Sequence, residues 1–192
     1  MNRLSLWTRL LLVAAAMTVV LVGMVAMKQY TLSTGTLVTL ETKPVDPRSL
    51  FRGDYVRLRY AISLIDLKAL PGDDDFTRGD TLYVVLAKSD PFWTPVSVHA
   101  SMPALAPGQV AIKGEVANHW YYPGDDKTPS TNQLDVTYGI ESYFVPEGQG
   151  HELEDPTKIG LISIVVAVDR FGNAGISQVL VDGKPRFTEK LF

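Results

Sequence analysis

The sequence predicts a mainly β fold class: an N-terminal transmembrane helix followed by a single antiparallel β-barrel or β-sandwich-like domain, with room for one short helix. Three observations carry this prediction. The run Leu10–Met27 has no charged residue, the segments after it alternate apolar and polar residues, and clusters of Pro, Gly and Asp separate those segments. A period of two is typical of half-buried strands. The 192 residues suffice for one anchor and one domain whose core needs no metal or disulfide.

The apolar run is long enough to cross a bilayer as a helix. Its 18 residues rise about 27 Å, close to the thickness of the hydrocarbon core. The alternative is a cleaved signal peptide, because basic residues precede the run. Cleavage needs small residues at the last and third-last positions, and a cut after Ala26 would place Met24 third-last. We therefore expect a retained anchor.

The charges around the run predict its orientation. Arg3 and Arg9 precede it and Lys28 alone follows at once, so the positive-inside rule keeps the N-terminus in the cytoplasm. The predicted location is the cytoplasmic (inner) membrane, crossed once, with an extracytoplasmic (periplasmic) domain. A cytoplasmic N-terminus, a transmembrane helix and an exported domain are expected at residues 1–9, 10–27 and 28–192.

Composition narrows the classes of partner and cofactor. The chain has 18 basic and 21 acidic residues; without the three basic residues named above, 15 face 21, a net charge of −6 for the exported part. A nucleic-acid partner would favour the opposite sign, so none is expected. The sequence has no cysteine, so no disulfide supports the domain, and no cofactor is expected.

Eight strands are expected in the exported part. They are Thr34–Thr42, Tyr55–Asp66, Thr81–Lys88, Val96–Ala100, Gln109–Trp120, Gln133–Val145, Ile159–Asp169 and Gly175–Val181. The last two are joined through Gly172 and Asn173, residues that tolerate positive φ, so these strands should be antiparallel neighbours. The charged stretch Glu147–Thr157 is the candidate for the short helix.

The tripeptide Arg-Gly-Asp occurs at residues 52–54 and 78–80, each time ahead of an apolar strand. Glycine permits a tight turn, and aspartate accepts hydrogen bonds from nearby backbone amides. We interpret both tripeptides as turns that lead into strands.

The stretch GDYVRLRY, at residues 53–60, resembles the motif that gives the GDYxxLxY family of membrane-anchored proteins its name. The matching residues are Gly53, Asp54, Tyr55, Leu58 and Tyr60. The segments ETKPVDPRSLFRGDY and YGIESYFVPEGQG resemble the same family, so the resemblance covers nearly the whole exported domain. It implies a small anchored ectodomain without an assigned activity, encoded beside or fused to multi-pass membrane proteins. A multi-pass membrane protein is therefore the expected partner.

Alternation predicts which side chains of the two motif segments face the core. One core face should hold Val56, Leu58, Tyr60 and Ile62, with Arg57 and Arg59 on the opposite face. In the second segment, the grouping is Tyr138, Ile140, Ser142 and Phe144 against Gly139, Glu141, Tyr143 and Val145.

If these two strands pair, Arg57 or Arg59 meets Glu141 across the ladder. Further charges stand at the neighbouring turns, among them Asp46, Arg48 and Glu147. Opposite charges across a ladder are commonly structural and contribute about 0.2 to 1 kcal/mol. The alternative is a polar cleft that binds an anionic ligand or a peptide edge through the guanidinium groups.

No catalytic or metal-binding set emerges from the sequence. The three histidines lack paired spacing, and the aspartate clusters lack the pattern of a calcium loop. One stretch, SMPALAPGQVAIK, loosely resembles the serine box of signal-peptidase-like serine/lysine proteases, with Ser101 as nucleophile and Lys113 or Lys158 as base. Those proteases have a residue between Met and Pro that this chain lacks.

The expected function follows from the anchor and the missing catalytic set. We expect a non-enzymatic binding or accessory module for a membrane partner. The alternatives are a ligand-binding ectodomain with a charged cleft around Arg57, Arg59 and Glu141, and the serine/lysine hydrolase.

Overall fold

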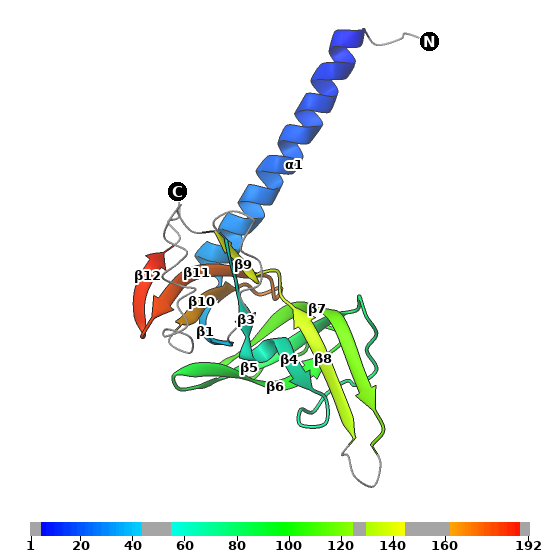
Figure 1. Ribbon diagram of the computed structural model, residues 1–192. Coiled ribbons are helices and arrows are strands. Elements are labelled where there is room, and N and C mark those ends of the chain that lie inside the picture. The colour runs from blue at the N-terminus through cyan, green and yellow to red at the C-terminus, as the bar shows by residue number, and fades with distance from the viewer. Residues whose placement is uncertain (1–4, 44–54, 125–129, 145–161, 189–192) are drawn as a thin grey trace.

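The computed structural model describes residues 5–43, 55–124, 130–144 and 162–188, which form one long helix and an antiparallel β domain (Figure 1). Helix α1 (Leu6–Thr34) begins at Ser5, whose side chain accepts a hydrogen bond from the N–H of Thr8. Its 29 residues rise about 43 Å. Within the described residues, α1 is the one helix long and apolar enough to cross a membrane.

The helix extends past both ends of the predicted 10–27 span. Its apolar side chains up to Met27 are exposed, and Thr31 in the last turns is buried. Gly35 then turns the chain into β1 (Thr36–Lys43). A Cβ at Gly35 would lie 2.5 Å from the Thr31 carbonyl oxygen and 2.8 Å from the Val168 nitrogen. Glycine is therefore required where the helix meets the sheet.

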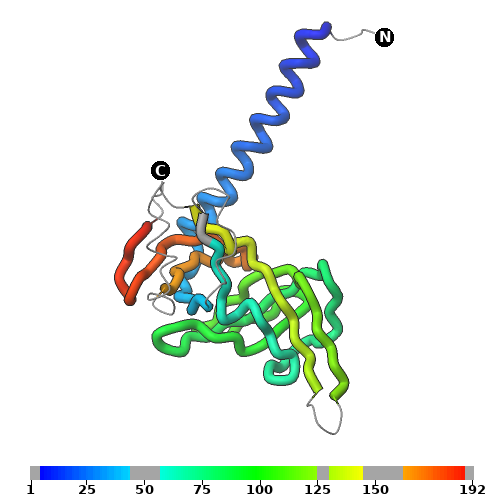
Figure 2. Tube along the Cα trace, viewed as in Figure 1, coloured from blue at the N-terminus to red at the C-terminus, as the bar shows by residue number. Residues whose placement is uncertain are grey.

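The strands form two five-stranded antiparallel sheets and a two-stranded ribbon, traced in Figure 2. The first sheet has the order β12 (Lys184–Thr188), β11 (Ala174–Val181), β10 (Ile162–Val168), β1 and β3 (Arg59–Tyr60). The second has the order β4 (Leu64–Asp66), β8 (Thr131–Thr137), β7 (Gln109–Tyr122), β5 (Thr81–Ser89) and β6 (Phe92–His99). The ribbon pairs β2 (Tyr55–Arg57) with β9 (Ser142–Phe144).

One buried apolar cluster draws on both five-stranded sheets. Val38 of β1, Ile164 of β10, Leu82 of β5, Ile112 of β7 and Leu134 of β8 all belong to it and are fully buried. Alternation along these strands sends one side chain in two to this core. The prediction of a mainly β, antiparallel domain after one apolar helix is confirmed.

The predicted strand Tyr55–Asp66 is divided into four short elements. β2, β3, the 3₁₀ turn η1 (Ala61–Ser63) and β4 follow one another within it. The division has a physical reason, because each strand pairs with a different partner: β2 with β9, β3 with β1 and β4 with β8. The segment that carries the sequence motif therefore connects the ribbon and both larger sheets.

The predicted strand Gln133–Val145 is also interrupted, between β8 and β9. Gly139 has a φ of +75°, and the Glu141 carboxylate accepts a hydrogen bond from the N–H of Tyr138. This turn shifts the alternation by one residue, so Tyr143 is buried while Ser142 and Phe144 are exposed. The predicted grouping of Ser142 and Phe144 with Tyr138, and of Tyr143 with Glu141, is wrong for this reason.

Two of the turns predicted from glycine and aspartate are present in the structure. β10 and β11 are antiparallel neighbours, and Gly172 between them has a φ of +85°. In the second Arg-Gly-Asp, Gly79 has a φ of +91°, and the Asp80 carboxylate accepts hydrogen bonds from the N–H and hydroxyl of Thr77 at 2.7 and 2.8 Å. The first Arg-Gly-Asp and the candidate helix Glu147–Thr157 lie outside the described residues.

Strand β12 was not expected from the sequence. Its residues KPRFT are mostly polar and exposed, so they lack the alternating apolar pattern. The hairpin that precedes it has positive φ at Asp182 and Gly183, of 52° and 70°. The dipeptide Asp-Gly strongly favours a β-hairpin turn, so this pair is the signal in the sequence that indicates a further strand after β11.

Candidate functional site

The described residues of the motif tie the two interrupted strands together. Leu58 and Tyr60 are buried, as predicted for the core face, and the N–H of Leu58 donates to the Glu141 carbonyl at 2.8 Å. The backbone of Tyr55 pairs with that of Phe144. Gly53 and Asp54 lie outside the described residues.

Two tyrosines bond across this junction. The Tyr60 hydroxyl donates to the carbonyl of Ile140 at 2.6 Å, and the Tyr138 hydroxyl donates to the carbonyl of Ile62 at 2.7 Å. Burial raises the pKa of both hydroxyls above the ordinary value for tyrosine, and the Glu141 carboxylate adds to the shift. Both side chains therefore remain neutral donors.

The predicted meeting of Arg57 or Arg59 with Glu141 does not form. Arg59 instead pairs with Asp135, with 3.1 Å between Nη2 and Oδ1 and both side chains partly exposed. Arg57 is exposed and lies opposite Ser142 in the ribbon. The reason is the turn before β9, where the Glu141 carboxylate bends back to the Tyr138 N–H and leaves the ladder. Asp46, Arg48 and Glu147 lie outside the described residues.

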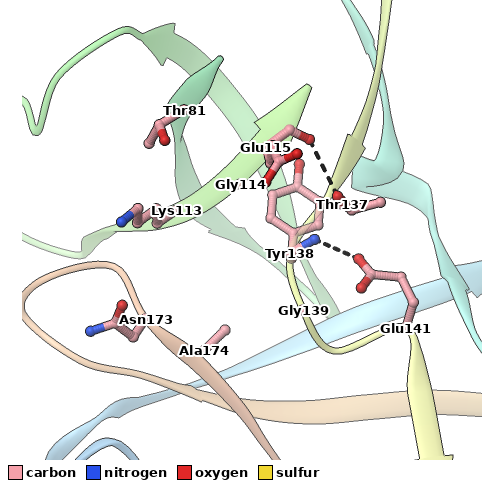
Figure 3. A pocket seen from close by; sticks show the side chains of 10 residues that line it. All are labelled: Thr81, Lys113, Gly114, Glu115, Thr137, Tyr138, Gly139, Glu141, Asn173 and Ala174. Carbon is pink, nitrogen blue, oxygen red and sulfur yellow. Dashed lines mark hydrogen bonds between the residues drawn. The ribbon is translucent and has the colours of Figure 1, made fainter. Parts of the chain in front are cut away.

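An open pocket of about 560 Å³ lies between the two larger sheets, at the turn that holds Glu141 (Figure 3). Its polar groups come from the start of β5, from β7, from the end of β8 and the turn that follows it, and from the turn after β10. The lining residues are Thr81, Lys113, Gly114, Glu115, Thr137, Tyr138, Gly139, Glu141, Asn173 and Ala174. Of the predicted site residues that the structure describes, Glu141 lines the pocket, whereas Arg57 and Arg59 do not.

Local packing explains the shape of this pocket. A Cβ at Gly114 would lie 2.5 Å from the Val136 side chain and 3.1 Å from the Tyr138 ring, so glycine lets these groups approach β7. Lys113 donates its backbone N–H to the carbonyl of Gly172 at 2.8 Å, which joins the turn after β10 to the second sheet. Alternation marks Lys113 and Glu115 as outward residues of β7, but nothing in the sequence indicates that the other turns approach them.

The helix is bonded to the domain through a buried pair that sequence reasoning did not find. The Thr31 hydroxyl donates to Asp169 Oδ2 at 2.7 Å, and both residues are buried. Asp169 Oδ1 also accepts the N–H groups of Phe171 and Asn173 at 2.9 and 3.0 Å. Burial alone raises the pKa of Asp169, but these hydrogen bonds outweigh it and hold the pKa below the usual value.

The candidate catalytic and metal-binding residues do not gather at one site in the part of the chain that the structure describes. Ser101 is exposed in the connection between β6 and β7, Lys113 lines the pocket, and Lys158 lies outside the described residues. His119 bridges the carbonyl of Phe76 and the side chain of Asn132, at 2.9 and 2.6 Å. In the part of the chain that the structure describes, no group of three or more His, Cys, Asp or Glu residues is placed to hold a metal.

Comparison with known protein families gives a match that covers most of the chain. The family model described as GDYXXLXY protein matches residues 17–179, from within α1 to within β11. No curated protein and no solved structure matches the chain significantly.

Proposed function

Because the chain belongs to the GDYXXLXY protein family, we propose that it is a single-pass membrane protein whose extracytoplasmic domain acts as a non-enzymatic binding or accessory module for a multi-pass membrane partner. The domain would lie on the periplasmic side of the cytoplasmic membrane, with the N-terminus in the cytoplasm. This orientation is supported by Arg3 and Arg9 ahead of the apolar run.

The observation that carries the proposal is the fixed junction between α1 and the domain. Thr31 is bonded to buried Asp169, and the side chain of Leu32 approaches the Cβ position of Gly175 to 3.0 Å. A cut at the end of the apolar run would leave about two helical turns, too short to be stable as an isolated helix. The junction is better maintained by a helix that continues into the membrane.

A fixed junction also gives the domain a defined orientation above the bilayer. A flexible linker would let the domain sample many orientations, whereas this helix holds it at one angle to the membrane. Such an arrangement suits recognition of a neighbour in the same bilayer, because the same face of the domain always meets it. The apolar side chains of α1 up to Met27 are exposed and can pack against helices of that neighbour.

Co-purification tests this function. The full-length chain would be solubilised in mild detergent, isolated under native conditions and examined by intact mass spectrometry. The expected result is an uncut N-terminus and one multi-pass membrane protein in a fixed ratio to the chain. A control chain, in which residues 10–27 are replaced by leucines, shows whether the helix or the domain holds the partner. A chain that begins near Lys28, or that purifies alone, would contradict the proposal.

The pocket favours a second candidate, a ligand-binding ectodomain. Its charged lining is one ammonium, from Lys113, and two carboxylates, from Glu115 and Glu141. Because carboxylates outnumber ammonium groups in this lining, the pocket suits a polar ligand with a positive charge. It suits less well the anionic ligand that was expected from Arg57 and Arg59. Thermal unfolding of the parent and of Glu115→Gln with a set of polyamines and amino acids tests it. A ligand that stabilises only the parent supports this role, and no stabilisation by any compound rejects it for these ligands.

A further inference from the structure

The turn at residues 169–173 is the part of the domain bonded directly to the end of α1. Asp169 begins it and accepts the Thr31 hydroxyl, and the exposed residues Arg170 and Phe171 follow. We propose that Arg170 and Phe171 form a second membrane contact, at the headgroup level of the bilayer that α1 spans. This inference rests on the proposed anchoring by α1.

The depth of Thr31 in the membrane follows from where the uncharged run ends. The uncharged run ends at Met27, and Thr31 follows four residues later, about 6 Å further along the helix axis. The polar layer on each side of the hydrocarbon core is about 5 to 8 Å thick. Thr31 therefore lies within the headgroup layer, and Asp169 lies at hydrogen-bond distance from it.

The aromatic residues of α1 support this depth. Trp7 and Tyr30 are both exposed and lie 23 residues apart on the helix, which corresponds to about 35 Å. Tryptophan and tyrosine are enriched at the two interfaces of a membrane, on either side of a core about 30 Å thick. Tyr30 directly precedes Thr31, so the interface and the bonded turn coincide.

The turn carries the chemistry of a membrane interface. Phe171 is 52% exposed, although it is a large apolar residue, and the Arg170 guanidinium lies over its ring at 4.6 Å from the centroid. An aromatic ring suits the boundary of the acyl chains, and a guanidinium binds phosphate through paired hydrogen bonds. The carboxylate of Asp169 is turned inward to Thr31, so it does not oppose anionic headgroups.

The position of the turn is consistent with this contact. Phe171 is two residues from Asp169, so their Cα atoms are at most about 7.6 Å apart. Figure 1 shows β10 and β11, which the turn connects, at the end of the domain where α1 enters, and both strands contact the helix. Another exposed aromatic residue, Tyr121 near the end of β7, lies on the hairpin that points away from α1.

Fluorescence quenching by spin-labelled lipids tests the contact. The chain has no cysteine, so Phe171→Cys, Tyr121→Cys and Val20→Cys each provide one site for a small fluorophore. The full-length variants would be reconstituted into phosphatidylcholine and phosphatidylglycerol vesicles with nitroxides either at the headgroup or deep in the acyl chain. Because positions 171 and 121 are both exposed, each labelled variant should unfold at the midpoint of the parent.

The expected result is several-fold stronger headgroup quenching at position 171 than at position 121, with deep quenching at position 20. Adding Arg170→Gln to the position-171 variant should weaken its quenching when phosphatidylglycerol is present. Equal quenching at 171 and 121, with position 20 still quenched, would overturn this inference and leave the anchor intact. Absence of deep quenching at position 20 would overturn the anchor and this inference together.

Discussion

Tyr60 and Tyr138 each donate a buried hydroxyl to a backbone carbonyl of the other's segment. Tyr60 bonds to Ile140, two residues after Tyr138, and Tyr138 bonds to Ile62, two residues after Tyr60. These are the points where the chain leaves one sheet for another. The final tyrosine of the GDYxxLxY motif therefore has a structural role, because its hydroxyl bonds the motif segment to the turn between β8 and β9.

Removing either hydroxyl should destabilise the domain. Tyr60→Phe or Tyr138→Phe leaves a buried carbonyl without its donor, at a cost of about 1 to 3 kcal/mol in the free energy of unfolding. Urea unfolding of the full-length protein in detergent measures it. Tyr121→Phe is the control, since Tyr121 is 67% exposed. This variant should change the free energy of unfolding by no more than about 0.5 kcal/mol. Equal stability of all three variants would reject the structural role.

The same tyrosines predict sensitivity to alkaline pH. Their pKa values are raised in the folded protein, so above the unfolded value of about 10 the unfolded chain releases protons that the folded chain retains. The contribution of these tyrosines to the free energy of unfolding should be fully present below pH 10 and should decrease as the pH rises above 10. Tyr60→Phe should reduce the loss of unfolding free energy between pH 10 and 11 by about 1 kcal/mol, and by up to about 1.4 kcal/mol per pH unit at higher pH. An unchanged slope between pH 10 and 11 would contradict burial of the hydroxyl.

The bond between Thr31 and Asp169 should hold the helix at a fixed angle. Thr31→Val removes the donor and should broaden the distance distribution between spin labels on Val20→Cys and Tyr121→Cys, measured by pulsed electron resonance. Thr18→Val is the matched control, because the Thr18 hydroxyl bonds only to the Ala14 carbonyl of its own helix among the described residues. Should both variants keep the narrow distribution of the parent, the bond does not set the angle.

Replacing either Arg57 or Arg59 by alanine should change the stability of the domain only slightly. Arg57 is exposed, so Arg57→Ala should leave the midpoint of unfolding nearly unchanged. Arg59→Ala loses a partly exposed ion pair with Asp135, which contributes at most about 1 kcal/mol. Partner binding measured on the same variants then reports function separately. Unfolding caused by Arg57→Ala would show that this arginine is structural.

A stability test of Gly53 complements these variants. We predict from the sequence that Gly53 turns the chain into the motif strand with a positive φ. Gly53→Val should then cost more than about 1 kcal/mol. A Gly53→Val protein that melts like the parent but loses its partner would instead make the turn itself the binding site.

The sequence predicted the elements better than their connections. The apolar run and the period-two segments indicated the helix and most strands, because both patterns are local. The slip of alternation at Gly139 was not predictable, since it depends on Glu141 closing a turn on Tyr138. The division of the Tyr55–Asp66 segment likewise depends on three different partner strands, which no local pattern specifies.

The candidate sites show the same limit. Arg57 and Arg59 were correctly assigned to the outward face, but the partner of Arg59 is Asp135 of β8, a strand that pairs with β4. The bond from Thr31 to Asp169 joins residues 138 positions apart. Within its own segment, neither residue differs from an ordinary polar residue. The hydrogen bond between them is therefore evident only in the folded structure.

Photo-crosslinking in native membranes tests whether α1 contacts a multi-pass membrane protein. A photoreactive residue would be placed in turn at Val19, Val20, Leu21 and Val22, which are all exposed and together circle the helix. If α1 contacts a membrane partner, an adduct with one multi-pass membrane protein is expected at one or two of these positions. Adducts with lipid alone at all four positions, or only with a second copy of the chain, would contradict it.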